Sequence, residues 1–568
     1  MKYRIERNVQ GEWIMTGVWK RGHAVLADPL LNKGTAFTSE ERDLFELDGM
    51  LPYQETDRDH QVQRAYEHVL DKGDNPLEKY VAMASLLDRN ETLFYQLLAT
   101  RVEELLPIVY TPTVGQAAIT FSHIFRRGRG LWITPDHKGR IFEVLGHARN
   151  EVVKLIVVTD NERILSLGDQ GVGGMVIPVG KLALYTLGSG IHPVYTLPIS
   201  LDVGTDNEDL LADDLYVGWR HPRLRGEEYY ELVDEFVDAV KRRWPRAVLQ
   251  WEDFKKANAF TLLDRYRRAV TSFNDDIQGT AAVVVAGIIA YCRATGTKLS
   301  DQRVMLVGAG AAGVGIGRQL HHELEESGLV GDGLRTAIAL FDSRGLVIDD
   351  GSDLDDHKRD LAWPEEVAAA AGLDRSSDLA AAVQAIQPTV LIGTTGKAGV
   401  FTEPIIRGLV KHVENPLVMA LSNPTSKSEA VPDDIFKWTD GRAYVATGSP
   451  FEPVEYGGRT LGVNQCNNVY VFPGVGLGAI VSEATEVTDS MFAAAAHALA
   501  EQVDSPTLAA GMLYPPLTEL RSISRSIAAA VAREARDSGV GTEATDAEID
   551  ERLDHEIWNL DYPTLRPA

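Results

Sequence analysis

The chain has 568 residues, too many for a single hydrophobic core, and its size predicts about three or four units that each bury their own apolar interior. With 56 basic and 82 acidic residues the net charge is −26, which argues against a nucleic-acid partner or an acidic membrane surface. Only Cys292 and Cys466 are present, which excludes a disulfide framework and a thiolate zinc cage and favours a reducing, cytoplasmic setting.

The beginning of the chain contains no recognisable targeting segment. Residues 1–8 include an early acid and lack an apolar core, unlike a secretory signal or a typical transit peptide. We expect no apolar run long enough to span a membrane. From 38 to 106, apolar residues recur three and four positions apart, which is the period of a helix. We therefore expect residues 1–106 to form a helical N-terminal domain.

Strand and helix patterns alternate beyond Pro107, and this alternation indicates α/β domains. In residues 107–275 we expect strands at 152–158 and 194–201 and helices at 175–187 and 227–244. A second α/β unit, 276–473, has strand patterns at 303–307, 337–341, 389–392 and 417–420. The Ala-rich tail, 474–568, returns to a helical pattern.

A glycine-rich turn follows the expected strand at 303–307. Gly308, Gly310 and Gly313 stand between that strand and a helical segment, which is the dinucleotide-binding arrangement. Gly308 permits a tight turn, Gly310 lets a pyrophosphate approach the backbone, and Gly313 lets the helix pack close to the strand. The fold class is therefore α/β: a Rossmann-type NAD-binding domain and an α/β substrate domain, with helical N-terminal and C-terminal regions.

The choice between NAD and NADP depends on the end of the next strand. Asp342 stands there, where an acid would accept a hydrogen bond from a ribose 2′-hydroxyl and repel a 2′-phosphate. It lies farther from the glycines than the usual spacing of about 20 residues, so the intervening helix must be long. Arg344 and Lys358 could instead receive a phosphate. NAD is the expected cofactor, and NADP is the alternative.

Two pairs of carboxylates mark the ends of other strand patterns. Asp275 and Asp276 stand where a short strand gives way to an apolar helix, and Glu252 and Asp253 end another apolar run. Adjacent carboxylates repel each other unless a cation lies between them, and Mg²⁺ or Mn²⁺ prefers oxygen ligands. The alternative is that these are ordinary solvated acids at strand ends and at a helix start. The pattern indicates a candidate metal site.

Lys181 is a single charge within an apolar helical run, 177–185. A lone ammonium group is costly to bury unless a carboxylate lies next to it. A buried lysine can have a depressed pKa and act as a base. The alternative is that its aliphatic stem packs against the helix surface while its charged head reaches water.

These segments together resemble the malic enzyme family. The resemblance rests on the segments 107–115, 157–165 and 420–425, on the Lys181 helix and on the two acidic pairs, and it covers nearly the whole chain. It implies oxidative decarboxylation of L-malate to pyruvate and CO₂, with reduction of NAD and with Mg²⁺ or Mn²⁺ required. It also implies a homo-oligomer, a dimer or a tetramer, in which the helical N-terminal domain is a candidate interface.

The resemblance further implies roles for single residues. Lys181 would take the hydroxyl proton of malate with Asp275 as its carboxylate neighbour, and Tyr110 would protonate the enolpyruvate carbon with help from Lys181. Arg163 would pair with a substrate carboxylate. Three carboxylates would hold the metal: Glu252, Asp253 and Asp276. Asn423 and Asn468 would hydrogen-bond substrate or nicotinamide, and Arg163 is also expected to contact the cofactor.

Two other functions are open at this point. A malolactic enzyme would convert malate to lactate without net reduction of NAD, but Arg163 and the sequence from Tyr110 to Thr113 favour malic enzyme. A catalytically silent NAD-binding regulatory protein would keep the fold and lose catalytic groups. That alternative is disfavoured because every ionisable position of the family pattern carries the expected residue type.

Overall fold

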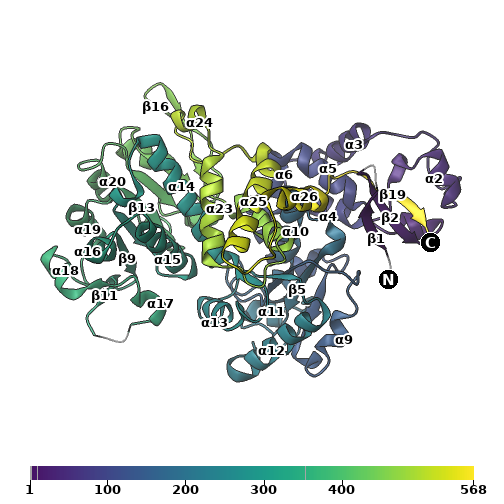
Figure 1. Cartoon of the computed structure of the whole chain (residues 1–568), viewed down its shortest axis with the longest axis horizontal. Coiled ribbons are helices and arrows are strands. Elements are labelled where there is room, and N and C mark those ends of the chain that lie inside the picture. Colours follow the sequence, from purple (N-terminus) through teal and green to yellow (C-terminus); the bar gives the residue numbers. More distant parts are fainter. Residues whose placement is uncertain (1–2, 9–10, 352–353) are drawn as a thin grey trace.

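The computed structural model describes residues 3–8, 11–351 and 354–568 and is organised by two large sheets (Figure 1). All their strand pairs are parallel except that of the edge strand β10 with β9. The green part of Figure 1 contains the larger sheet, and the blue part contains the smaller one. The C-terminal helices, in yellow, lie between the green part and the purple N-terminal helices, above the blue part. Every predicted α/β element is present, so the predicted fold class is confirmed.

The smaller sheet has five parallel strands in the order β3-β5-β4-β6-β7. Its central strands are buried along their whole length, as expected for a parallel sheet covered on both faces. Because β4, β6 and β7 pair in register, the residues that follow them, among them Glu252 and Asp275, emerge at one edge. The strands are β3 (Leu131–Ile133), β4 (Leu155–Thr159), β5 (Thr196–Leu201), β6 (Val248–Trp251) and β7 (Ser272–Asn274).

The larger sheet has seven strands in the order β10-β9-β8-β13-β14-β15-β18. The carboxyl ends of β8, β13, β14 and β15 lie level, because Val307, Gly393, Ala420 and Thr447 are paired in register. The strands are β8 (Val304–Val307), β9 (Ile338–Asp342), β10 (Gly345–Leu346), β13 (Val390–Gly393), β14 (Leu417–Ala420), β15 (Tyr444–Thr447) and β18 (Asn464–Gln465). Their order is that of a doubly wound dinucleotide-binding sheet.

Two buried helices bring catalytic candidates into the interior. They are α10 (Val176–Ser189), which carries Lys181, and α14 (Thr280–Thr295), which follows Asp275 and leads from the smaller sheet to the larger one. With the turns before them, both are apolar and long enough to cross a membrane, so the expectation that no run reaches this length is wrong. Their most apolar windows are 94% and 78% buried, so the fold itself covers them.

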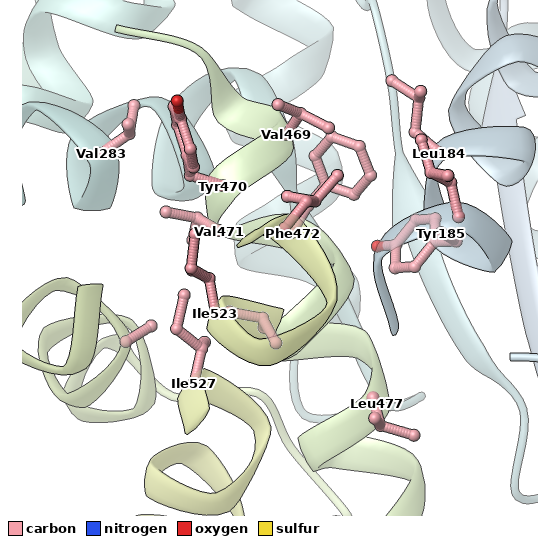
Figure 2. Packing of buried hydrophobic residues seen from close by; sticks show 14 of the residues in the cluster. Leu184, Tyr185, Val283, Val469, Tyr470, Val471, Phe472, Leu477, Ile523 and Ile527 are labelled. Carbon is pink, nitrogen blue, oxygen red and sulfur yellow. The ribbon is translucent and has the colours of Figure 1, made fainter. Parts of the chain in front are cut away.

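The C-terminal helices pack closely because glycines face their partners. In α22 (Phe472–Val481), a Cβ at Gly478 would lie 2.7 Å from Val531 Cβ, and one at Gly476 would lie 2.6 Å from the Tyr185 ring. Figure 2 shows Phe472 of α22 beside Tyr185 of α10, with Ile523 and Ile527 of α25 (Leu520–Asp537) below. The other helices of this group are α23 (Asp489–Glu501), α25 (Leu520–Asp537) and α26 (Asp546–Glu556).

The N-terminal part contains the predicted helices and also strands that the sequence analysis does not predict. The strands β1 (Arg4–Arg7) and β2 (Trp13–Val18) pair with each other, and β19 (Thr564–Pro567) at the end of the chain pairs with β2. Both termini therefore lie at one end of the molecule (Figure 1). The helices are α2 (Ser39–Leu44), α3 (Arg58–Leu70), α4 (Pro76–Arg89), α5 (Glu91–Thr100) and α6 (Val102–Val109).

Replacing Gly478 by alanine tests the packing of the C-terminal helices. The new methyl group would meet Val531 and the Ala528 carbonyl oxygen at 2.7 and 2.8 Å, so we expect destabilisation of about 1–3 kcal/mol and a lower midpoint in urea denaturation. Gly333→Ala is the matched control, because no atom lies within 4 Å of the added carbon and the residue is helical. Equal midpoints for Gly478→Ala and the wild type would contradict close packing.

Candidate active site

The cleft between the two sheets gathers most of the residues singled out from the sequence. It has a volume of about 240 Å³ and lies where the carboxyl edges of both sheets meet. Eight predicted site residues line it: Tyr110, Arg163, Lys181, Glu252, Asp253, Asp276, Asn423 and Asn468. Asp275 lies behind this wall and is fully buried. The predicted substrate and metal residues are therefore neighbours in space.

Lys181 is the centre of the site. Its side chain is almost fully buried, and its Nζ lies 2.7 Å from Asp275 Oδ2, 2.8 Å from Glu252 Oε1 and 3.2 Å from the Tyr110 hydroxyl. The ammonium group also lies 4.4 Å from the centroid of the Phe472 ring. These contacts exclude the alternative in which the charged head reaches water, and they supply the carboxylate neighbour expected from the sequence.

The charges around Lys181 determine its protonation. Burial alone would lower its pKa, but the carboxylates of Asp275 and Glu252 outweigh burial, and the pKa of Lys181 is raised well above its ordinary value. The depressed pKa considered for a buried lysine is therefore wrong for the protein without a metal ion. Burial raises the pKa of the Tyr110 phenol well above its usual range, with Lys181 opposing the shift.

A π-helical turn over Asp275–Gly279 separates the two adjacent aspartates. Asp275 Oδ2 accepts hydrogen bonds from Lys181 Nζ and, at 2.9 Å, from Asn468 Nδ2. Asp276 Oδ2 instead accepts from the backbone N–H of Asp253 at 2.8 Å. A side chain at Gly279 would clash with Asp275, because a Cβ there would lie 1.9 Å from its Oδ1. The turn thus sends one carboxylate to the lysine and the other to a second acidic group.

That second group is a cluster of three carboxylates, Glu252, Asp253 and Asp276, each offering an oxygen within 4.8 Å of the others. Burial, followed by repulsion from neighbouring acids, raises the pKa of Glu252 to about 8 and that of Asp276 to about 6, although Lys181 opposes both shifts. Burial and the other two acids raise the pKa of Asp253 well above its usual range. Clustered oxygen donors that repel each other fit a hard divalent cation.

Some supporting residues were not found by sequence reasoning. Gln250 donates from Nε2 to Glu252 Oε2 at 2.6 Å, and Tyr185 donates to Gln250 Oε1. A signal was present, because Gln250 is the only amide in the buried strand β6 and Tyr185 stands one helical turn after Lys181. Phe472 lacked such a signal, because its approach to Lys181 depends on the packing of α22 against α10.

The remaining predicted substrate contacts lie on loops at the mouth of the cleft. Arg163 is exposed, and its backbone N–H donates to the Asp253 carbonyl at 3.2 Å. Asn423 follows β14, and its Oδ1 accepts from Ser449 Oγ at 2.5 Å. Both side chains border the same space as Lys181, so they can reach a small ligand bound there.

The glycine turn has the geometry expected of a dinucleotide site. Gly308 has a φ of 119°, and a Cβ at Gly313 would lie 1.8 Å from the Gly308 carbonyl oxygen, so neither position accepts a side chain. No atom lies within 4 Å of the position of a Cβ at Gly310, which leaves room for a phosphate. Gly308, Gly310 and Gly313 lie beside the cleft and do not line it, whereas Ala312 of the same turn does.

Asp342 ends β9 on the other side of the glycine turn. The long spacing from the glycines is explained by α15 (Ala311–Glu326) and a further short helix, α16 (Gly331–Thr336). Asp342 Oδ2 lies 2.7 Å from Lys358 Nζ and 3.5 Å from Arg344 Nη2. Asp342, the candidate acceptor for a ribose 2′-hydroxyl, therefore contacts both Lys358 and Arg344, the two candidates for binding a 2′-phosphate.

The doubly wound sheet, the glycine turn and the adjoining lysine–carboxylate cluster define a dinucleotide-dependent oxidoreductase. The family description "Malic enzyme, N-terminal domain" matches residues 87–267, and "Malic enzyme, NAD binding domain" matches residues 277–536. The chain belongs to the malic enzyme family.

Relatives and solved structures agree with this assignment. The chain is 49% identical over 543 residues to the NAD-dependent malic enzyme of Proteus mirabilis (strain HI4320), covering 95% of this chain and 96% of that relative. It is 48% identical to the NAD-dependent malic enzyme of Aeromonas salmonicida (strain A449), covering 96% of each chain. The crystal structure of Entamoeba histolytica malic enzyme has the same fold, with a TM-score of 0.57 and 23% identity over 83% of this chain and 87% of that one.

The carboxylate cluster predicts how pH acts on the metal-free protein. The pKa of Glu252 is raised from 4.5 to about 8, so between these values the unfolded chain loses a proton that the folded protein keeps. Below about pH 4.5 Glu252 is protonated in both states and does not affect the free energy of unfolding. As the pH rises from there to about 8, Glu252 lowers the free energy of unfolding increasingly. We expect Glu252→Gln to flatten this decline, measured by urea denaturation across that range.

The thermal stabilisation of the protein by Mn²⁺ tests whether the same carboxylates bind a cation. Because the cation replaces protons on the cluster, we expect it to raise the melting temperature more at about pH 8 than at about pH 5, and to do so less in Glu252→Gln. Equal stabilisation at both pH values, and in the variant, would mean that Mn²⁺ binds elsewhere.

Replacing Asp342 by serine is expected to change cofactor use. The substitution would remove the carboxylate expected to accept from a ribose 2′-hydroxyl, and it would free Lys358 and Arg344, which contact Asp342, to receive a 2′-phosphate. We expect kcat/KM with NAD to fall by about tenfold or more and kcat/KM with NADP to rise, as measured by steady-state kinetics with each cofactor. An unchanged ratio between the two would show that the ribose is recognised elsewhere.

Proposed function

We propose that the chain catalyses the oxidative decarboxylation of L-malate to pyruvate and CO₂ with reduction of NAD. The observation that carries the proposal is the position of Lys181. Its buried ammonium group lies between Asp275 and Glu252, beside Tyr110, in the cleft that borders the dinucleotide-binding sheet. A proton acceptor, a proton donor and a metal-type carboxylate cluster are thereby available to one small substrate.

Glu252, Asp253 and Asp276 would hold Mg²⁺ or Mn²⁺, because their oxygens are clustered and their neighbours supply little positive charge beyond Lys181. When bound, such a cation supplies Lewis-acid polarisation of substrate oxygens and stabilises enolate charge. Gln250 holds one oxygen of Glu252 at 2.6 Å and so orients the other toward the cleft.

Lys181 would accept the C2 hydroxyl proton while the C2 hydride passes to the nicotinamide ring. The carboxylates that surround it keep the lysine protonated, so it can serve as a base only when the negative charge beside it is reduced. Asp275 positions the lysine at 2.7 Å, and Asn468 in turn positions Asp275 at 2.9 Å. The chain therefore orients its base through two successive contacts.

Loss of CO₂ breaks the bond between C3 and C4, and the resulting enolate must gain a proton at C3. Tyr110 would donate that proton and recover one from Lys181, which donates to the phenol oxygen at 3.2 Å. The lysine would thus return to Tyr110 the proton that it took from the substrate hydroxyl. Arg163 would pair with a carboxylate of malate, while Asn423 and Asn468 would hydrogen-bond the substrate or the nicotinamide amide.

Both other functions have less support. The similar proteins in Proteus mirabilis and Aeromonas salmonicida are NAD-dependent malic enzymes, which disfavours a malolactic enzyme. A silent binding protein is disfavoured because Lys181, Tyr110, Asp275 and the carboxylate cluster are present and in mutual contact.

The domain boundaries, the cellular compartment and the oligomeric state are also proposals. We propose domains 1–106, 107–275, 276–473 and 474–568, with the five-stranded sheet in the second range and the seven-stranded sheet in the third. We also propose a cytoplasmic homo-oligomer that uses the N-terminal helical part. Its exposed apolar side chains support such an interface, because Tyr53 is 96% exposed and Met50 51%.

Purified protein with L-malate, Mn²⁺ and NAD tests the proposed reaction, with Lys181→Ala measured in parallel. We expect reduced cofactor and pyruvate to rise together, and kcat to fall by about a thousandfold in the variant. Lys138→Ala is the control, because Lys138 forms a half-exposed ion pair with Glu231 away from the cleft. Lactate formed while the absorbance of reduced cofactor stays constant would indicate a malolactic enzyme. No product with NAD, or with NADP in its place, would indicate a catalytically silent NAD-binding protein.

A further inference from the structure

Glu429 is a buried carboxylate that the proposed reaction does not use. It is fully buried and connects two loops of the larger sheet. Its Oε1 accepts hydrogen bonds from Thr395 N–H at 2.7 Å, Thr395 Oγ1 at 2.8 Å and Ser422 Oγ at 2.5 Å. Its Oε2 accepts from Ser422 N–H at 3.2 Å. One side chain thus holds the loop after β13 and the loop after β14.

Glu429 does not take part in an ion pair within the part of the chain that the structure describes. Over the described ranges 3–8, 11–351 and 354–568, no lysine, arginine or histidine nitrogen lies within 4.0 Å of Glu429 in an ion pair. Gly396 N–H donates to Ser422 Oγ at 2.8 Å, which leaves the serine hydroxyl hydrogen free to donate to Glu429. Both carboxylate oxygens of Glu429 therefore accept hydrogen bonds, all from groups of the two loops.

The two tied loops form the wall of the cleft where the nicotinamide ring must lie. In a doubly wound sheet the dinucleotide crosses the carboxyl edge at the change of strand direction, here between β8 and β13. The adenosine half lies toward β9 and Asp342, so the nicotinamide half lies toward β13 and β14. Thr394, Gly396, Ser422 and Asn423 from these loops line the same cleft as Lys181.

We propose that Glu429 is a positioning residue for the nicotinamide end of the cofactor, and that its unpaired negative charge favours the oxidised cofactor over the reduced one. The oxidised ring carries one positive charge, and the ring is neutral after it receives the hydride. A negative charge directly behind Ser422, which lines the cleft, therefore attracts NAD and loses that attraction once NADH has formed. This inference rests on the proposed function for the location of the ring and deepens it, because it links cofactor charge to product release.

Glu429→Gln tests the inference, since it keeps the size of the side chain and removes its charge. Kd values for NAD, NADH and ADP-ribose are measured by calorimetry without malate. We expect the Kd for NAD to rise about tenfold, the Kd for NADH to rise less than about threefold, and the Kd for ADP-ribose, which lacks the ring, to stay the same. Glu403→Gln is the matched control, because Glu403 is half-exposed and pairs with Arg407 on the surface.

Equal weakening of NAD and NADH, or loss of ADP-ribose binding in a folded variant, would overturn the inference. Thr395→Val provides a second variant that keeps the Glu429 charge and removes one donor. We expect it to weaken both nicotinamide cofactors while keeping their affinity ratio, and a fall in that ratio would also contradict the inference. Because binding is measured without malate, failure here is distinguishable from failure of the proposed reaction, which malate turnover by the wild type decides.

Discussion

The structure depends on one buried ammonium group held between carboxylates at the meeting point of two sheets. Lys181 on α10 contacts Asp275, which begins the turn into α14, and Glu252, which follows β6. An unpaired charge at this depth would be strongly destabilising, so these three groups must arrive together. The same three-way contact joins the smaller sheet, the helix that leads to the larger sheet, and the cleft in which chemistry would occur.

Packing far from the cleft keeps this contact in place. Glycines on α22 let that helix approach α10, where Phe472 covers the lysine and Tyr185 orients Gln250 toward Glu252. The level carboxyl ends of both sheets then present polar loops to one space. The C-terminal helices therefore act on the site through Phe472 and Tyr185, neither of which lines the cleft.

Much of this arrangement could be predicted from the sequence, because parallel strands send the residues after their ends to one edge, which groups Glu252 with Asp275. The pattern could not show that a π-helical turn sends Asp275 to Lys181 and Asp276 to the metal cluster. Nor could it reveal the pairing of β19 with β2, whose residues lie more than 500 positions apart, or the link from Glu429 to two loops. The raised pKa of Lys181 also depends on distances that spacing does not contain.

Among the described residues, Lys181 is the one cation that forms an ion pair with Glu252, Asp253 or Asp276, so this carboxylate cluster keeps protons until a divalent cation replaces them. The most direct measurement is the number of protons released when Mn²⁺ binds at pH 7, obtained by calorimetry in buffers of different ionisation enthalpy. Because burial and repulsion raise the pKa of Glu252 to about 8 and that of Asp253 well above its usual range, we expect Mn²⁺ to release at least one proton from the wild type and fewer from Glu252→Gln. Tight Mn²⁺ binding without proton release in either protein would contradict this account.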